Sequence, residues 1–447
     1  MRKFRLDFRS AFFQQDEMHE EVWVPVPPGD PAFVEGKRMC RRLAKWVPGT
    51  KSAPRGWFDT VARKLWESGW VQSKLDPCLF YWRSEGQDAA DFGELLAYLP
   101  LHVDDSLGRV VHGLSGELEQ SLKQVFDLGE FEWIDDGMKV TFCGVTQTEL
   151  PDCVESEQLA YVDSMQQAPL DKQRSKRREA EATPDEVSSF RTVQGQSIWC
   201  TTNTRPECSY ETSVGASSVN RLKIGDIVRA NKLVRHLHQT PQVLRRPRLP
   251  PGNVKVVVVT DAGEGEQNRD DFCRAQGGKC VGLMLDTPSP EPGWMWLVEV
   301  RSGKLARVTH NSFDAESIIG VEGLDAGMAV AKLVEEFKYG PTPTMRDRAM
   351  ASLPPRPRVK VELQTDSNSL VTHVASIRMD PRLAKRRRQD VADVKEAIAL
   401  GDIYPLVFIR GLWNIMDPLT KCRSRTKLTM QELIKVLTTG WYAPPLG

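Results

Sequence analysis

Residues 95–111 read LLAYLPLHVDDSLGRVV, in which two apolar stretches, Leu95–Val103 and Leu107–Val111, flank the polar segment Asp104-Asp105-Ser106. This pattern predicts two buried strands joined by a tight acidic turn. Two adjacent carboxylates repel each other by about 4 kcal/mol at 4 Å and an effective dielectric of 20, and Asn-Gly or Asp-Gly makes a better hairpin turn. A divalent cation turns this repulsion into binding, because Mg²⁺ prefers carboxylate oxygens together with substrate phosphates. The alternative is a solvent-exposed turn.

Asp7 stands in a comparable place near the N-terminus. It lies in FRLDFRSAF (residues 4–12), at the end of a stretch whose apolar residues alternate as in a strand. An Asp at a strand end is common at turns and helix caps. Asp7 therefore indicates a metal site only if the fold brings it to Asp104 and Asp105, which spacing does not determine.

The C-terminal half holds four acids at the ends of predicted elements. Two follow predicted strands and two stand at the start of predicted helices: Asp261, Asp366, Glu316 and Asp390. Four carboxylates meeting at one sheet edge suit two metal ions about 3.5–4 Å apart, which position a water and stabilise the leaving oxygen in phosphodiester cleavage. Helix capping is the alternative for each acid taken singly, because Asp and Glu favour helix N-termini.

Length and composition set the outer limits. The 447 residues predict about three domains. Sixty Lys and Arg balance sixty Asp and Glu, which excludes nucleic-acid binding through bulk positive charge alone. No stretch reaches the roughly 20 apolar residues of a membrane helix, and the N-terminus has no apolar signal core, so we expect an intracellular protein, cytoplasmic or nuclear, without a membrane partner. Nine cysteines without a CxxC pair favour reduced thiols.

Hydrophobic patterning divides the chain further. Up to Gln147 it predicts a helix over Val61–Trp70 and a strand over Phe142–Gln147. A flexible linker is expected over Asp171–Glu186, because that segment is almost without apolar residues. A helical region over Val187–Thr240 and a Pro/Arg loop over Thr240–Gly252 follow it. A new domain is expected from Asn253. Its predicted strands are 254–260, 280–285, 294–300, 359–364 and 404–409, and its predicted helices are 314–338, 391–400 and 430–437. This alternation indicates a mixed α/β domain.

Several short motifs follow one another along the chain. The first half carries LDFRSAF (6–12), VPVPPG (24–29), KSAPRGW (51–57), SKLDPCLF (73–80) and HVDD (102–105). The second half carries FCGV (142–145), TRPE (204–207), TDA (260–262), QGG (276–278), DAE (314–316), TDSNS (365–369) and DPLTK (417–421). In this order they resemble the reverse transcriptase–ribonuclease H part of copia-type LTR retrotransposon polyproteins.

For the polymerase half, the resemblance implies that Asp7, Asp104 and Asp105 hold two Mg²⁺ (or Mn²⁺) ions. One ion would activate the primer 3′-hydroxyl and the other would hold the incoming deoxynucleoside triphosphate. Phe12 would be the steric gate against a ribose 2′-hydroxyl. Lys51 and Arg55 would lie near the nucleotide or the template.

For the second half, the resemblance implies a ribonuclease H site. Its metal ligands would be Asp261, Glu316, Asp366 and Asp390. For the fourth ligand, Asp380 and Asp393 compete with Asp390.

The expected fold class is therefore a multidomain α/β and α+β protein, a truncated reverse-transcriptase palm and thumb followed by a ribonuclease H-like domain. The expected domains are residues 1–165 (palm and start of the thumb), 166–252 (linker and helical connection) and 253–447 (ribonuclease H-like). The resemblance also implies that fingers and further polyprotein segments are missing upstream, and His102 stands where the family has Tyr.

The resemblance implies an RNA-directed DNA polymerase with a ribonuclease H-type domain, working by two-metal phosphoryl transfer on a template-primer and on an RNA–DNA hybrid. The missing fingers predict impaired polymerase activity. The alternative is a non-catalytic, nucleic-acid-binding remnant of a retroelement.

Overall fold

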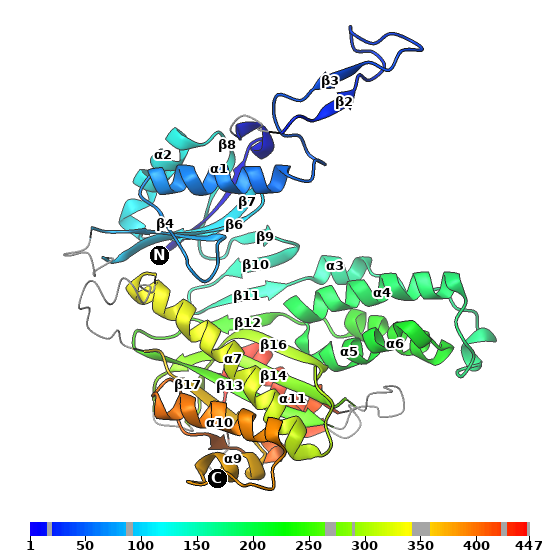
Figure 1. Cartoon of the computed structure of the whole chain (residues 1–447), viewed down its shortest axis with the longest axis vertical. Coiled ribbons are helices and arrows are strands. Elements are labelled where there is room, and N and C mark those ends of the chain that lie inside the picture. Colours follow the sequence, from blue (N-terminus) through cyan, green and yellow to red (C-terminus); the bar gives the residue numbers. More distant parts are fainter. Residues whose placement is uncertain are drawn as a thin grey trace. The chain divides into compact units, whose positions relative to one another are not determined.

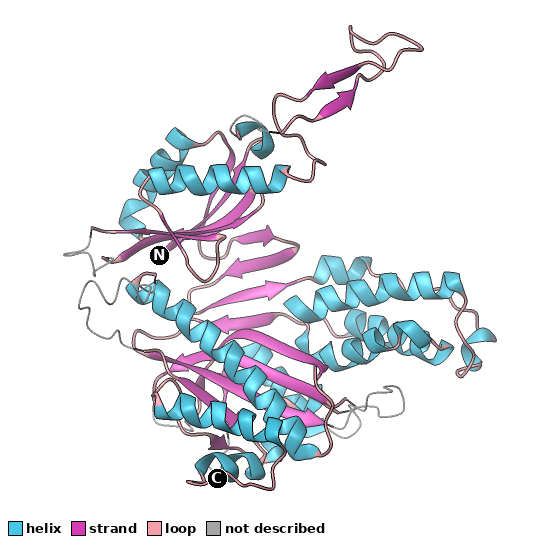
Figure 2. Ribbon diagram, viewed as in Figure 1, coloured by secondary structure: helices cyan, strands magenta, loops and turns pink. Residues whose placement is uncertain are grey.

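The computed structural model describes residues 1–15, 20–85, 93–263, 274–287, 291–341, 358–421 and 427–444. The chain forms two compact units, each described by itself. Unit 1 comprises Met1–Asp135 and Glu335–Arg356, and unit 2 comprises Asp136–Val334 and Pro357–Gly447. Both units combine sheets with helices (Figures 1 and 2). In the described part of the chain, no helix is long and apolar enough to cross a membrane.

Among the described residues of unit 1, six strands form one antiparallel sheet. Across the sheet they run β4 (Val71–Gln72), β5 (Leu79–Arg83), β6 (Leu95–His102), β7 (Asp105–Val110), β1 (Arg2–Phe8) and β8 (Leu128–Ile134). The predicted pair of strands around the acidic turn is thus present as β6 and β7. β1 fills the place beside β7, which brings Asp7 to the turn.

Two helices cover this sheet, α1 (Ala53–Glu67) and α2 (Ser115–Val125). Their buried side chains share one apolar cluster with alternate residues of β1, namely Trp57, Val61, Leu65, Leu118 and Leu122 with Phe4, Leu6 and Phe8. Helix α1 begins well before the predicted Val61, because Pro54 occupies its first turn, where a missing N–H costs nothing. A short 3-10 helix, η1 (Ala11–Gln14), follows β1, and β2 (Trp23–Pro25) pairs with β3 (Cys40–Arg42).

Unit 2 opens with a sheet that, over the described residues, has four strands. They are ordered β12 (Leu244–Pro247), β11 (Cys153–Glu157), β10 (Val145–Glu149) and β9 (Lys139–Phe142). The predicted single strand over Phe142–Gln147 is wrong, because Cys143 and Gly144 both have positive φ (47° and 70°) and form a two-residue hairpin turn between β9 and β10. The expected Pro/Arg loop contains β12, which pairs with β11.

A helical part follows, with α3 (Leu159–Ser164), α4 (Pro184–Asn203), η4 (Pro206–Cys208), α5 (Ser209–Ser217) and α6 (Ile224–Gln239). It confirms the predicted helical region. The predicted flexible linker before it is wrong. Arg174 forms a 2.9 Å ion pair with Glu186, which also completes the capping box of α4 with Thr183. The charged residues of this segment cannot form an apolar core, but ion pairing and helix capping between them order it.

The C-terminal sheet of unit 2 has, in the described ranges, the order β16 (Trp296–Lys304), β14 (Gln276–Leu285), β13 (Val254–Gly263), β17 (Val361–Thr365) and β18 (Val407–Phe408). β14 runs antiparallel to both β16 and β13, whereas β17 and β18 run parallel to β13. The predicted mixed α/β domain is therefore present. A separate antiparallel pair joins β15 (Gly293–Trp294), which lies between β14 and β16 in sequence, to β19 (Trp441–Tyr442) near the C-terminus.

Both faces of this sheet are covered, which explains the uninterrupted apolar run of β13. Val256 and Val258 pack with α7 (Ser312–Tyr339), α9 (Asn368–Ala375) and α10 (Lys385–Ala399), whereas Val257 and Val259 pack with α11 (Lys427–Thr439). A Cβ at Gly323 of α7 would lie 2.7 Å from Thr260. Glycine therefore lets α7 pack closely against β13, which sets the distance between Glu316 on α7 and Asp261 on β13.

Candidate functional site

Three carboxylates from distant parts of the sequence meet in unit 2. Asp261 lies near the end of β13, Asp366 directly follows β17, and Glu316 stands in the first turns of α7. β13 and β17 are parallel neighbours with Thr260 opposite Thr365, so both strands deliver their acids to the same edge of the sheet. One oxygen from each of the three carboxylates lies within 4.8 Å of the others. The structure thus brings together three of the four acids expected for a ribonuclease H site.

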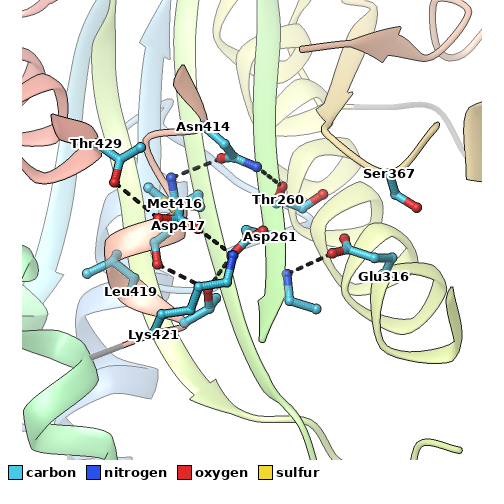
Figure 3. Close-up of polar contacts among 12 residues, drawn as sticks. Thr260, Asp261, Glu316, Ser367, Asn414, Met416, Asp417, Leu419, Lys421 and Thr429 are labelled. Atoms are coloured by element: carbon cyan, nitrogen blue, oxygen red, sulfur yellow. Dashed lines mark hydrogen bonds and ion pairs between the residues drawn. The ribbon is translucent and has the colours of Figure 1, made fainter. Parts of the chain in front are cut away.

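Neighbouring groups fix the orientation of Asp261 and Glu316 (Figure 3). The backbone N–H of Ala262 donates to Glu316 Oε1 at 3.2 Å, and the hydroxyl of Thr420 donates to Asp261 Oδ2. Lys421 Nζ lies 3.7 Å from Asp261 Oδ2. The Thr420-Lys421 segment therefore contacts the acids directly, which explains part of the DPLTK motif.

The cluster carries more negative charge than its surroundings neutralise. Burial, followed by the nearby Asp366, raises the pKa of Asp261 to about 7. Burial and then the two aspartates raise the pKa of Glu316 to about 9. Burial also raises the pKa of Asp366, while Lys421 opposes the shift. A divalent cation would relieve this repulsion, and an all-oxygen donor set suits the hard ions Mg²⁺ and Mn²⁺.

A further carboxylate at this site, Asp417, was not among the predicted ligands. It opens the short helix η8 (Asp417–Leu419), and Lys421 Nζ bridges it to Asp261. Its charge raises the pKa of both Asp261 and Asp366, and Thr429 Oγ1 donates to it at 3.1 Å. The DPLTK motif already contained this acid. The strand-end and helix-start patterns did not select it.

Asp390 lies in a different environment. It is buried on α10, where its two oxygens lie 3.0 Å from Arg307 Nη1 and 2.6 Å from Arg387 Nη1. Within the described residues, it is absent from the group of acids around Asp261. Of the two competing candidates, Asp380 pairs with Arg382 at 2.9 Å, and Asp393 is exposed on α10.

The second set of acids lies in unit 1. Asp7 on β1 stands directly opposite Asp105 on β7, and the N–H of Phe8 donates to the carbonyl of Asp104 at 2.9 Å. Burial, together with the charges of Asp104 and Asp105, raises the pKa of Asp7. Arg5 opposes that shift, and its Nη2 lies 3.4 Å from Asp105 Oδ1. Asp7, Asp104 and Asp105 therefore lie near one another, but within the described residues they are not among the groups whose ligand atoms converge within 4.8 Å, and a metal site here stays a prediction.

The turn that carries Asp104 has an unfavourable backbone. Val103 is β-branched and has a φ of +58°, a conformation that costs such residues on the order of 1–3 kcal/mol. Trp57 Nε1 of α1 donates to the Val103 carbonyl at 2.6 Å and holds the turn. This gives the tryptophan of the KSAPRGW motif a structural role that its spacing did not reveal.

The remaining predicted site residues of unit 1 lie between Asp7 and Asp104 in the sequence. Phe12 lies in η1, half-buried against the apolar core. Lys51 is exposed just before α1. Arg55 is exposed on α1 and forms a 2.9 Å ion pair with Asp59. Contact of Phe12, Lys51 and Arg55 with a nucleotide stays a prediction.

Curated proteins and solved structures resemble the chain, whereas no protein-family model matches it. It is 34% identical over 106 residues to the retrovirus-related Pol polyprotein from transposon RE2 of Arabidopsis thaliana, which covers 23% of this chain and 6% of that protein. It is 30% identical over 127 residues to the corresponding polyprotein from transposon TNT 1-94 of Nicotiana tabacum, which covers 28% of this chain and 9% of that protein. The chain thus matches a small part of these relatives.

Among solved structures, the foamy viral protease-reverse transcriptase in complex with RNA/DNA hybrid aligns with 92% of this chain and 44% of its own. The sequence identity is 9% and the TM-score 0.44. The sequence similarities confirm the predicted resemblance to a retrotransposon Pol polyprotein. The sheets and helices of both units confirm the mixed α/β fold class.

The raised pKa of Glu316 predicts how stability depends on pH without metal. Between about pH 5 and 9 the unfolded chain has released this proton while the folded chain retains it, so the stability of the wild type falls as pH rises. We expect Glu316→Gln to raise the melting temperature by a few degrees at about pH 8 in EDTA, and to change it little at about pH 4. Thermal scans across this pH range measure the difference. A difference independent of pH would contradict the prediction.

Proposed function

We propose that the chain is the polymerase and ribonuclease H part of a copia-type retrotransposon Pol polyprotein, and that unit 2 cleaves the RNA strand of an RNA–DNA hybrid. The convergence of Asp261, Glu316 and Asp366, with Asp417 beside them, carries this proposal. The strand order and directions of their sheet also fit a ribonuclease H-like domain. Mg²⁺ or Mn²⁺ is the expected cofactor, because all of the donors are oxygens.

In this proposal, each residue has a defined task. Asp261, Glu316 and Asp366 would hold the ions, whose chemistry is to supply an activated water and to stabilise the leaving oxygen. The Ala262 N–H and the Thr420 hydroxyl keep Glu316 and Asp261 oriented before an ion arrives. Preorganised ligands of this kind lower the cost of assembling the site during the reaction.

Unit 1 would provide the polymerase activity, with Asp7, Asp104 and Asp105 as metal ligands and a template-primer and deoxynucleoside triphosphates as substrates. Three observations support it: the pairing of Asp7 with Asp105, the shared electrostatics of the three acids, and the turn at Val103 held by Trp57. Phe12 would exclude the ribose 2′-hydroxyl, and Lys51 and Arg55 would contact the nucleotide or template.

Cleavage of an RNA–DNA hybrid tests unit 2. We expect Mg²⁺-dependent cleavage that falls more than about 100-fold in Glu316→Gln, because the variant removes one charged ligand. Glu322→Gln, which lies on the same helix and away from the three-acid group, is the matched control and should cleave like the wild type. Salt-sensitive hybrid binding without cleavage would instead favour the non-catalytic remnant.

Two variants test whether Asp417 or Asp390 is the fourth acid of the unit 2 site. We expect Asp417→Asn to lower hybrid cleavage at least about 10-fold with little change in stability, because its carboxylate lies at the acid cluster. Asp390→Asn should instead destabilise the protein by about 3 kcal/mol, because it leaves Arg307 and Arg387 facing a neutral partner. Cleavage per folded molecule and urea unfolding measure the two effects. The opposite pattern would restore Asp390 as the fourth ligand.

Primer extension tests unit 1 through a glycine. A Cβ at Gly129 of β8 would overlap with Asp7 Oδ2, so Gly129→Ala must displace that carboxylate. We expect extension to fall by up to about 100-fold, towards the level of Asp104→Asn, because misplaced ligands are nearly as harmful as absent ones. Gly116→Ala on α2 is the control, since no atom lies within 4 Å of its Cβ. Extension by Gly129→Ala at the wild-type rate would place Asp7 outside the chemistry.

A further inference from the structure

A second group of potential metal ligands lies in the helical part of unit 2, apart from the acid cluster. Glu207 and Cys208 are consecutive residues of η4, and His236 lies on α6. One ligand atom from each residue, a carboxylate oxygen, a thiol sulfur and a ring nitrogen, lies within 4.8 Å of the other two. Glu207 and Cys208 are buried and His236 is half-buried. The three residues thus converge from two separate elements.

Arg205 fixes the positions of these elements. Its buried guanidinium donates from Nε to Glu207 Oε1 at 2.7 Å, from Nη1 to the Leu237 carbonyl at 3.3 Å and from Nη2 to Thr240 Oγ1 at 3.0 Å. Arg205 therefore ties η4 to the last turn of α6, which carries His236. The geometry of the three donors is built by the fold and does not depend on an ion.

The charges around the donors are compatible with a cation. A carboxylate has two oxygens, so Arg205 can hold one while the other binds a metal, an arrangement that orients metal ligands in many sites. The Cys208 thiol donates to Glu207 Oε1 at 3.5 Å, and loss of its proton to solvent on binding would give a thiolate. Because Arg205 already offsets Glu207, a divalent ion with this thiolate leaves one net positive charge. Glu211, one helical turn beyond Glu207, adds a further acid to the cleft that His236 lines.

The donor types select the metal. A sulfur, an imidazole nitrogen and a carboxylate oxygen together favour Zn²⁺ over Mg²⁺ or Ca²⁺, which prefer oxygen alone. Three protein donors leave one position of a tetrahedral ion for water or another ligand. His236 lines a cleft of about 490 Å³ between α4, α5 and α6, whose other walls include Tyr210 and Arg229. The cleft thus reaches the three donors at His236, while Glu207 and Cys208 are not among its lining residues.

We propose that Glu207, Cys208 and His236 form a Zn²⁺ site that joins η4 to α6. The competing view is that Arg205 and Glu207 form a buried ion pair beside a core cysteine and a surface histidine, with no affinity for metal. The two views differ in whether Cys208 and His236 act together on an added ion. Metal binding here is independent of the proposed cleavage and polymerase activities.

Co²⁺ is the probe, because a Co²⁺–thiolate bond gives a near-ultraviolet charge-transfer band that carboxylate-bound Co²⁺ lacks. Full-length protein is stripped of metal, excess Mg²⁺ is added to fill the oxygen sites, and Co²⁺ is titrated in. We expect one thiolate-bound Co²⁺ per chain, displaced by Zn²⁺. Cys208→Ser should abolish the band, and His236→Asn should weaken Co²⁺ affinity at least about 10-fold.

Two controls match these variants. Cys153→Ser changes another buried thiol of unit 2, next to Arg245, and His238→Asn changes a histidine on the same helix whose Nε2 lies 2.8 Å from the Val162 carbonyl. Both should retain the wild-type band and affinity. His236→Asn alters a half-buried residue, so it tests the site even if Cys208→Ser misfolds. Absence of the band in the wild type, or an unchanged band and affinity in His236→Asn, would overturn the proposal.

Discussion

Repulsion between neighbouring carboxylates is the constraint on which the acid cluster of unit 2 depends. In unit 2, Asp261 and Glu316 are buried beside each other, although burial and proximity both oppose their ionisation. The close approach of α7 to β13 at Gly323 and the contacts from Thr420 hold them there. A fold that only needed stability would place apolar side chains at such a site, because desolvated like charges weaken the folded state.

Most of the elements around these acids follow from local patterning. The run Val256–Val259 and the stretch Val359–Gln364 each predict a strand that ends at an acid. That the two strands are parallel neighbours, which brings Asp261 and Asp366 to one edge of the sheet, is a long-range pairing that only the structure shows. Local patterning suffices for the turn at Asp104, because β6 and β7 are adjacent in sequence. The pairing of β1 with β7 is again a long-range contact, and local pattern carries no information about it.

The positions that patterning missed are decided by which charged partners surround them in the fold. Asp390 was expected at the start of a helix, but α10 begins five residues earlier at Lys385, and Arg307, 83 residues away, pairs with it. Asp417 lies in a short 3-10 helix without periodicity, and its role depends on Lys421 and on Asp261. The segment before α4 was expected to be flexible from its charged composition, whereas the Arg174–Glu186 pair orders it. Composition records how many charges a segment has and not how they pair.

The two kinds of donor group in unit 2 separate cations by chemistry. The cluster around Asp261 offers only carboxylate oxygens as donors. These suit a hard ion such as the proposed Mg²⁺, and the described residues of the cluster include no thiolate that would favour Zn²⁺. Cys208 and His236 offer sulfur and nitrogen, for which Mg²⁺ competes poorly because it releases its water shell reluctantly. In the proposed assignments, Cys208 and His236 would therefore retain a scarce Zn²⁺ ion, and the oxygen donors around Asp261 would take Mg²⁺. This division follows from the ligand atoms alone and requires no communication between the two sites.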